Sequence, residues 1–236
     1  MFNNVWDGKE YNKLLKKLDE AKENKDYIDF TSKIVNTNYK IIGIKTPNLK
    51  KIAKEIGKTD IISYLNICKD NTYEEVILQG LAISYIKDVK TSIKCFNKFI
   101  KKIDSWAICD TVIASMKIVK KNKEIYYKEI EKYIKSKDEF IVRVGIILLL
   151  DYYIDDIYID NIFELINNIN REEYYINMGI AWLVSVCFVK QKDKTYKYLK
   201  NNNLDKFTYN KAIQKMIESF RVEDSDKDIL RQMKRV

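Results

Sequence analysis

Proline and glycine are scarce in this sequence, and their scarcity constrains the fold more than any other feature. The 236 residues include a single Pro and six Gly. A β-sandwich or β-barrel needs many more turn residues than this. Apolar residues also recur at helical spacing, as at Leu49, Ile52, Ala53 and Ile56. We therefore predict an almost entirely helical protein, and the lack of a Pro/Gly/Ser-rich linker predicts one domain spanning residues 1–236.

Capping signals and apolar periodicity predict where the helices lie. Thr46-Pro47 indicates an N-cap followed by Pro at the first helical position. Asn71 to Glu75 resembles the capped start of a helix that continues over 76–86. Further helices are predicted at about 92–102, 106–120, 124–135, 139–152, 157–168, 172–189, 192–199, 207–219 and 225–233.

The predicted helices come in pairs, with one pair in roughly every 30–40 residues and short polar loops between them. This rhythm is typical of HEAT-like repeats, so we predict an all-α fold, an α-solenoid of helical repeats. The repeats are not similar in sequence, and a globular helical bundle is the alternative. A solenoid would provide a concave face long enough to hold a DNA duplex.

The chain is basic, with 43 Lys and Arg against 34 Asp and Glu and a formal net charge of +9. Such an excess is typical of proteins that bind nucleic acid, although the codon bias of an AT-rich genome also enriches lysine. The longest apolar run, from Val144 to Leu150, is far shorter than the roughly 20 residues of a membrane span. We expect a cytoplasmic bacterial monomer that acts at the nucleoid and has no membrane partner.

Metal and cofactor sites are not indicated. The four cysteines form no CxxC pair, which argues against zinc. The acidic run DYYIDDIYID (151–160) lacks the Gly and Glu of a calcium loop, so we interpret it as a solvated connection between helices. Histidine is absent, which excludes Ser-His-Asp and Cys-His catalysis. Any reaction must therefore need little proton shuttling and run on groups such as a carboxylate.

The segment IDSWAICDT (103–111) contains one candidate for such a group. Trp106 and Asp110 are four residues apart, so they share a helix face and can touch one ligand. The residues between them are apolar, and a carboxylate near a core is costly unless it is paired or used. The structural alternative pairs Asp110 with a Lys or Arg, for example Arg143, and places Trp106 in the core.

Three other segments carry candidate residues. Arg143 stands alone in FIVRVGIILLL, so its guanidinium must reach either a carboxylate or a phosphate. Trp182 lies in a long apolar helix, where residue type alone predicts a core position. Lys211, Lys215 and Arg221 recur at roughly helical spacing, as either a solvated face or a phosphate-binding stripe.

Six segments, taken in order, resemble the AlkD-type DNA alkylation repair family and extend over almost the whole chain. They are IIGIKTPNLKKIAK, YEEVILQGLAI, SWAICDT, FIVRVGIILLL, YYINMGIAWLVSVCF and NKAIQKMIESFR. Members of this family are α-solenoids of HEAT-like repeats that wrap duplex DNA on a basic concave face. The resemblance therefore implies a right-handed α-solenoid with such a face. The characterised members are monofunctional DNA glycosylases that need no cofactor and release cationic N3- and N7-alkylpurines.

The resemblance implies an active centre of two tryptophans around one aspartate, which are Trp106, Trp182 and Asp110 in this sequence. It also implies that Arg143 contacts DNA, and we expect further DNA contacts from Lys45, Lys211, Lys215 and Arg221. Two positions depart from the family pattern: Lys45 stands where glutamine is expected, and Ile34 where an aromatic is expected. A non-catalytic module that binds DNA shape or junctions, and a protein-binding solenoid, are therefore the competing hypotheses.

Overall fold

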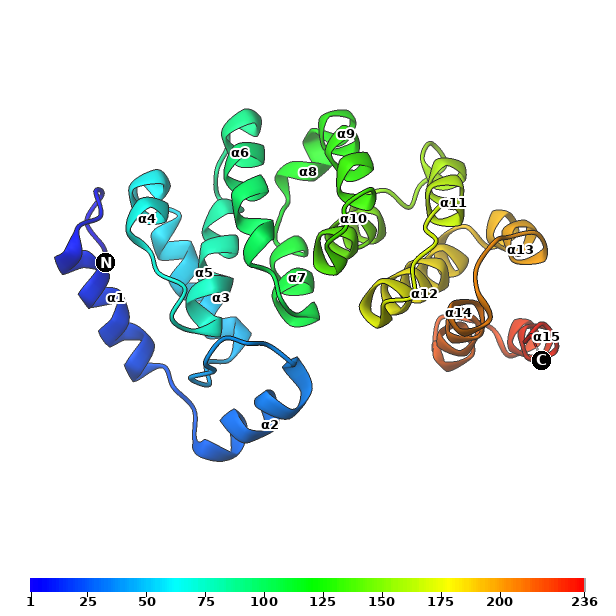
Figure 1. The fold of residues 1–236 in the computed structure, drawn as a ribbon, viewed down its shortest axis with the longest axis horizontal. Coiled ribbons are helices and arrows are strands. Elements are labelled where there is room, and N and C mark those ends of the chain that lie inside the picture. The colour runs from blue at the N-terminus through cyan, green and yellow to red at the C-terminus, as the bar shows by residue number, and fades with distance from the viewer. Residues whose placement is uncertain (236) are drawn as a thin grey trace. The chain divides into compact units, whose positions relative to one another are not determined.

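Helices form nearly all of the regular structure (Figure 1). The computed structural model describes residues 1–235, and within them the only β-type pairing is an isolated bridge between Lys40 and Thr72. The all-α prediction is confirmed, and helices that are neighbours in sequence pack on one another, consistent with an α-solenoid of HEAT-like repeats. The chain divides into two compact units, unit 1 (Met1–Asn122) and unit 2 (Lys123–Val236), and the single domain remains a prediction.

Unit 1 is built around helix α5 (Tyr73–Ile83), whose residues are all buried. Helices α3, α4, α6 and α7 pack against it. Gly80 lets α5 approach α7 closely, because a Cβ there would lie 2.4 Å from Cγ2 of Val112. The other helices of unit 1 are α1 (Gly8–Glu20), α2 (Lys25–Val35), α3 (Thr46–Ile56), α4 (Ile61–Ile67), α6 (Val89–Phe99), the 3₁₀ turn η1 (Ile100–Lys102), α7 (Trp106–Ile113) and α8 (Ile118–Lys121).

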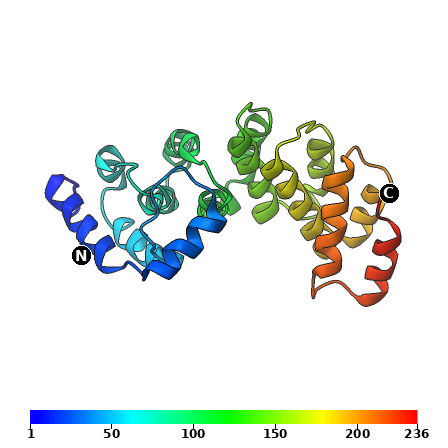
Figure 2. The same ribbon diagram turned by 60° about the horizontal axis from the view of Figure 1, so that its bottom comes forward.

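Unit 2 is organised by three helices that alternate with others in the chain, α10 (Glu139–Tyr152), α12 (Tyr174–Lys190) and α14 (Lys206–Glu218). Helix α12 lies between the other two and packs on both. Figure 2 shows α14 beside the last helix, α15 (Asp224–Gln232), which packs on it. The remaining helices are α9 (Lys123–Ile134), α11 (Ile159–Asn167) and α13 (Lys192–Lys200).

Most predicted helices are present, but one prediction is wrong. The single helix expected over 106–120 is two helices, because the N–H groups of Ser115 and Met116 bond carbonyls three residues back and close a tight turn. That turn buries Met116 and Val119. Helices α2 and α4 were not expected. The apolar side chains of α2 do recur at helical spacing, but Phe30 and Ile34 are exposed and only Val35 is buried.

Two predicted caps and the acidic run also have clear outcomes. Thr72 caps α5 as expected: its hydroxyl accepts from the Glu75 N–H and donates to the Glu75 carboxylate. The N-cap of α3 is Lys45, one residue before the predicted Thr46. The run at 151–160 does connect two helices, but it is not simply solvated, because Tyr153 is fully buried.

Candidate functional site

Helix α7 carries the two candidate residues of unit 1. The buried Ser105 caps the helix by accepting a 3.4 Å hydrogen bond from the Ile108 N–H. Trp106 is the first residue of α7 and Asp110 follows one turn later, and both side chains are half-buried while the three residues between them are buried. Trp106 is therefore not the core residue of the structural alternative. One helix face presents an indole ring and a carboxylate side by side.

The N-terminal end of α7 is tied to the end of α2 by polar contacts. The Trp106 indole N–H donates to the backbone carbonyl of Ile34 at 3.0 Å. The Asp104 carboxylate accepts from the Thr37 hydroxyl at 2.6 Å and from the Asn38 N–H at 2.7 Å. The indole contacts the main chain at the position where the family pattern has an aromatic, so the Ile34 side chain does not alter this hydrogen bond.

Asp104 and Thr37 have positioning roles that the sequence analysis missed. The sequence signal was the polar pair Asp104-Ser105 immediately before the apolar start of α7. Ser105 caps the helix, and Asp104 reaches 66 and 67 residues back along the chain. No local pattern in a single sequence identifies such a distant partner.

The loop before α3 holds Lys45 and is anchored on a buried carboxylate. Glu74 accepts hydrogen bonds from the N–H groups of Ile42, Gly43 and Ile44, the shortest being 2.7 Å from Gly43. Burial raises the pKa of Glu74 despite these hydrogen bonds. Gly43 has φ +81°, and a Cβ there would lie 2.4 Å from the side chain of Ile28. Both constraints require glycine in the IIGIKTP segment.

Lys45 already has partners within unit 1. Its ammonium lies 3.1 Å from a carboxylate oxygen of Glu23 and 5.6 Å from the centre of the Tyr27 ring. Its side chain is about half exposed, at 52%. A phosphate at Lys45 would therefore compete with Glu23 for the ammonium.

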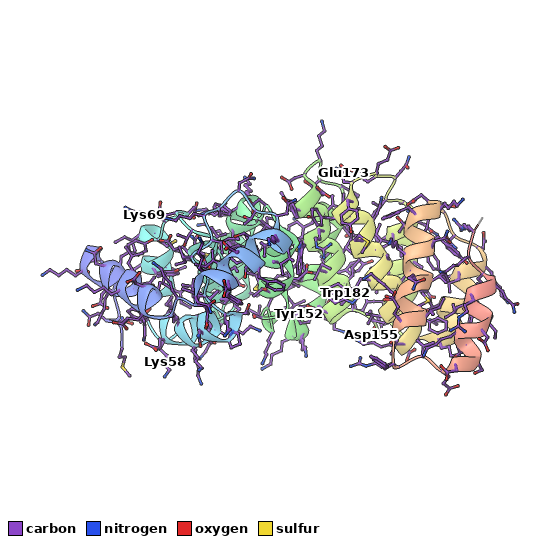
Figure 3. All side chains as sticks on the ribbon, turned by 90° about the horizontal axis from the view of Figure 1, so that it is seen from below. Lys58, Lys69, Tyr152, Asp155, Glu173 and Trp182 are labelled. Carbon is purple, nitrogen blue, oxygen red and sulfur yellow. The ribbon has the colours of Figure 1, made fainter. Side chains whose placement is uncertain are left out.

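Helix α12 of unit 2 presents Trp182 to solvent. Trp182 is 37% exposed although its neighbours Ala181 and Leu183 are fully buried, so the core position expected from residue type is wrong. Tyr174, Met178 and Trp182 are spaced four residues apart along α12, and each is exposed or half-exposed. In Figure 3, Trp182 lies along α12, and Glu173 marks the N-terminal end of that helix. The indole N–H of Trp182 makes no hydrogen bond to the residues described.

Arg143 lies in α10 and is only 5% exposed. One of its guanidinium nitrogens donates to the Tyr175 carbonyl of α12 at 2.7 Å. Gly179 makes room for this contact, since a Cβ there would lie 3.5 Å from Nη1 of Arg143 and 3.3 Å from Ile146. The guanidinium therefore packs against α12 one turn before Trp182, and the structure brings these two candidates onto adjacent helices of unit 2.

The three basic candidates near α14 differ in their setting. Lys211 is exposed, Lys215 is half-buried one turn later, and Arg221 is exposed but lies beyond the end of the helix. Lys211 also lies over the Phe207 ring, 5.7 Å from its centre. Only the two lysines therefore keep the helical spacing that the sequence predicts.

Two further lysines, Lys206 and Lys234, extend this basic surface. Together with Lys211 they border an open cleft of about 640 Å³ beside Phe207. Among the described residues, no carboxylate lies within ion-pair distance of these three ammonium groups. Lys234 follows α15 in the sequence and reaches α14 by a 2.7 Å hydrogen bond to Gln214, which sequence spacing does not reveal.

Within residues 1–235, no group of three His, Cys, Asp or Glu side chains is placed to hold a metal ion. The same residues contain no helix that is both apolar and long enough to span a bilayer.

The fold and these residues define a helical-repeat protein with tryptophan-bearing helices and unpaired lysines, a class that includes nucleic-acid enzymes. A family model described as DNA alkylation repair enzyme matches residues 12–216. The chain therefore belongs to the family of DNA alkylation repair enzymes, and its substrate class is DNA. No curated protein matches the chain significantly.

Proposed function

We propose that this protein is a monofunctional DNA glycosylase that hydrolyses the N-glycosidic bond of cationic N3- and N7-alkylpurines in duplex DNA. The observation that carries the proposal is the pairing of Trp106 and Asp110 one turn apart on α7, both half-buried, in a member of a DNA alkylation repair family. An aromatic face beside a carboxylate suits a substrate that carries positive charge.

The proposed reaction needs no general acid from the protein and only one carboxylate. Alkylation at N3 or N7 places a positive charge on the purine, so the base is already a good leaving group and needs no general acid. This agrees with a chain that contains no histidine. As the bond breaks, positive charge moves to the deoxyribose, and the Asp110 carboxylate stabilises it and orients the attacking water, as carboxylates do in glycoside hydrolases.

Both tryptophans would contribute their ring faces. A cation over an indole gains about 0.5–2 kcal/mol, and the same attraction applies to an electron-poor sugar. The indole N–H of Trp106 is already used by Ile34, so its ring face is the part available to a substrate. We propose that Trp182 acts on the same nucleotide, as the family resemblance implies.

Phosphate contacts would hold the duplex. We assign them to Lys211, Lys215 and Arg221, with a weaker contribution from Lys45 because Glu23 neutralises it. Arg143 would act mainly through its positive charge, since its side chain is almost buried. Binding through such contacts depends on salt and little on sequence.

The test is the release of 3-methyladenine and 7-methylguanine from methylated duplex DNA. We expect free base from the wild type and a rate at least about 100-fold lower for Asp110→Asn, which keeps the side-chain shape but removes the charge. The control is Asp193→Asn, which removes an exposed carboxylate from α13. An inert wild type that still binds DNA would sink the glycosylase proposal.

A non-catalytic DNA-binding module is the second candidate. The ion pair of Lys45 with Glu23 and the aliphatic Ile34 favour it, because both positions depart from the family pattern. It predicts tight binding of bent or branched DNA without base release. Retention on DNA resin that is lost only at high salt would argue against a purely protein-binding solenoid.

A further inference from the structure

Unit 2 contains a second cleft, located where the N-terminal ends of α12 and α14 meet. Its volume is about 480 Å³, and its lining includes Tyr174, Asn177, Arg171, Asp205 and Phe207. Neither candidate catalytic residue of α7 lies in it, and neither does Trp182. The cleft is large enough for one planar heterocycle, because ligand pockets start at about 300 Å³.

A carboxamide without a protein partner lines this cleft. Asn177 is only 7% exposed, and no hydrogen bond joins its carboxamide to a described residue. Its polar atoms are not among the fully enclosed side-chain atoms that lack a partner, so they are open to the cleft and available to a ligand or water. A carboxamide has both donor and acceptor atoms, so its natural partner is an edge that offers both, as nucleobases do.

Two exposed aromatic rings stand beside the amide. Tyr174 is 57% exposed and Phe207 is 41% exposed, although both are large side chains. Their ring centres are 6.2 Å apart and the ring planes are tilted by 48°. The two rings contact each other, the edge-on ring of Tyr175 lies against Tyr174, and the ammonium of Lys211 lies over Phe207. The ring surface that remains exposed offers a planar ligand a stacking surface beside that lysine.

The wall of the cleft is fixed before any ligand arrives. The guanidinium of Arg171 is bound to Glu173 and donates to the carbonyls of Ser136 at 2.8 Å and Lys137 at 2.9 Å. These contacts neutralise its charge, and Asp205 adds a negative charge at the rim. The interior therefore suits a neutral planar group better than a phosphate.

The phosphates of such a ligand have a place next to the cleft. Phe207 borders both this cleft and the open cleft of Lys206, Lys211 and Lys234, whose ammonium groups have no carboxylate partner among the described residues. We propose that the cleft binds one unpaired nucleobase of DNA, stacked on Tyr174 and Phe207 and hydrogen-bonded by Asn177, while its phosphates lie on the lysines. The polymer is DNA because the chain belongs to a DNA alkylation repair family, and the inference rests on the proposed function only where it places a nucleotide at Trp182.

The position of the cleft predicts where the unpaired base stands in the strand. Tyr174 and Trp182 are eight residues apart on α12, which is about 12 Å of helical rise. At about 3.4 Å per nucleotide along one strand, this corresponds to between three and four steps. The cleft would thus hold a nucleotide a few steps away from one that lies at Trp182.

The experiment compares two DNA probes by fluorescence anisotropy. One is a blunt 12-base-pair duplex, and the other is the same duplex with three unpaired thymines at one end, tested with either strand extended. We expect the wild type to prefer the extended probe by about tenfold, the effect of stacking one base on aromatic side chains. Tyr174→Ala and Asn177→Ala should abolish this preference and leave blunt-duplex affinity within about twofold.

Two controls make the result specific. Phe220→Ala removes an aromatic ring that is fully exposed elsewhere in unit 2 and should keep the preference. Replacing the three thymines by abasic residues should remove the preference, because only phosphates remain. A preference that survives with abasic residues, or that persists in both Tyr174→Ala and Asn177→Ala, would overturn the proposal.

Base release from the blunt methylated duplex is measured on the same proteins. If the probe preference is present but no base is released, the cleft proposal stands and the glycosylase proposal fails. If base is released but the wild type shows no preference, the cleft proposal fails alone. The result for Asn177→Ala counts only if the thermal unfolding of this variant remains cooperative. If it does not, the result for Tyr174→Ala, which replaces an exposed residue, decides whether the cleft proposal holds.

Discussion

Trp106 and Trp182 have the same side chain and the same proposed role, but the two units hold them in different ways. Trp106 begins the eight-residue helix α7 and is half-buried, and its indole N–H donates a hydrogen bond to the Ile34 carbonyl. Trp182 lies within the 17-residue helix α12, is 37% exposed, and makes no indole hydrogen bond to the described residues. Unit 1 fixes its tryptophan by polar contacts, and unit 2 fixes its tryptophan through the packing of the helix that carries it.

The difference follows from helix length. Helix α7 packs on α5 through five buried residues, but it is short, so its cap and the bonds to Asp104 add to that packing at its N-terminal end. Helix α12 packs on α10, α13 and α14, and its apolar residues suffice to fix its axis and rotation. An exposed ring on α12 is therefore placed accurately without contacts of its own.

The largest effect should come from the packing that holds α12. Leu183 is fully buried next to Trp182, so Leu183→Ala should lower the free energy of unfolding by about 2–5 kcal/mol through lost burial and the cavity left behind. Urea unfolding measures this loss. Val186→Ala, at a half-exposed position of the same helix, is the control and should cost much less. Equal costs at both positions would contradict placement by packing.

The polar tie of α7 should matter somewhat less. Asp104→Ala removes the acceptor of two hydrogen bonds, and we expect a loss of about 1–3 kcal/mol. The loss should be local, so hydrogen exchange should rise in α2 and its following loop more than in α5. Asp19→Ala, which breaks an exposed ion pair with Lys22, should cost under about 1 kcal/mol. Unchanged exchange in α2 would show that Asp104 does not tie the two segments.

The two tryptophans can be compared directly by conservative replacement. Trp106→Phe removes the hydrogen bond to Ile34 and should cost about 1 kcal/mol. Trp182→Phe removes no hydrogen bond to the described residues and should change stability by under about 0.5 kcal/mol. Denaturant unfolding of both variants tests the difference. A larger loss for Trp182→Phe would reverse the comparison.

The smallest effect should come from an ion pair at the start of α12. Hydrogen bonds from Arg171 lower the pKa of Glu173 to about 2, so the pair stabilises the fold above about pH 4.5 and this stability is lost as the pH falls toward 2. Because both side chains are partly exposed, we expect about 0.5 kcal/mol. Urea midpoints between pH 2 and 5 should rise with pH less steeply for Glu173→Gln than for wild type, with Glu172→Gln as the control. Identical slopes for wild type and Glu173→Gln would assign no stabilisation to the pair.

Particular elements show how far the sequence alone predicts the fold and the candidate site. Periodicity placed α10, α12 and α14 closely, because long apolar helices repeat their pattern over several turns. It missed α2, which buries only Val35, and it joined α7 to α8, because a tight turn that buries Met116 keeps the apolar spacing. Trp182 was expected in the core by residue type, and only its place on α12 exposes it.

The sequence by itself determined that the chain is helical and basic, that it has no histidine, and that its motifs, taken in their order along the chain, are those of a DNA alkylation repair family. These properties depend on composition and on spacing within one element. The tertiary structure alone decided that Asp104 ties α7 to the end of α2, that Lys45 pairs with Glu23, and that Lys234 joins the surface of α14. The physical reason is that hydrogen bonds and ion pairs act over a few ångströms, and folding brings such partners together from positions that no local pattern links.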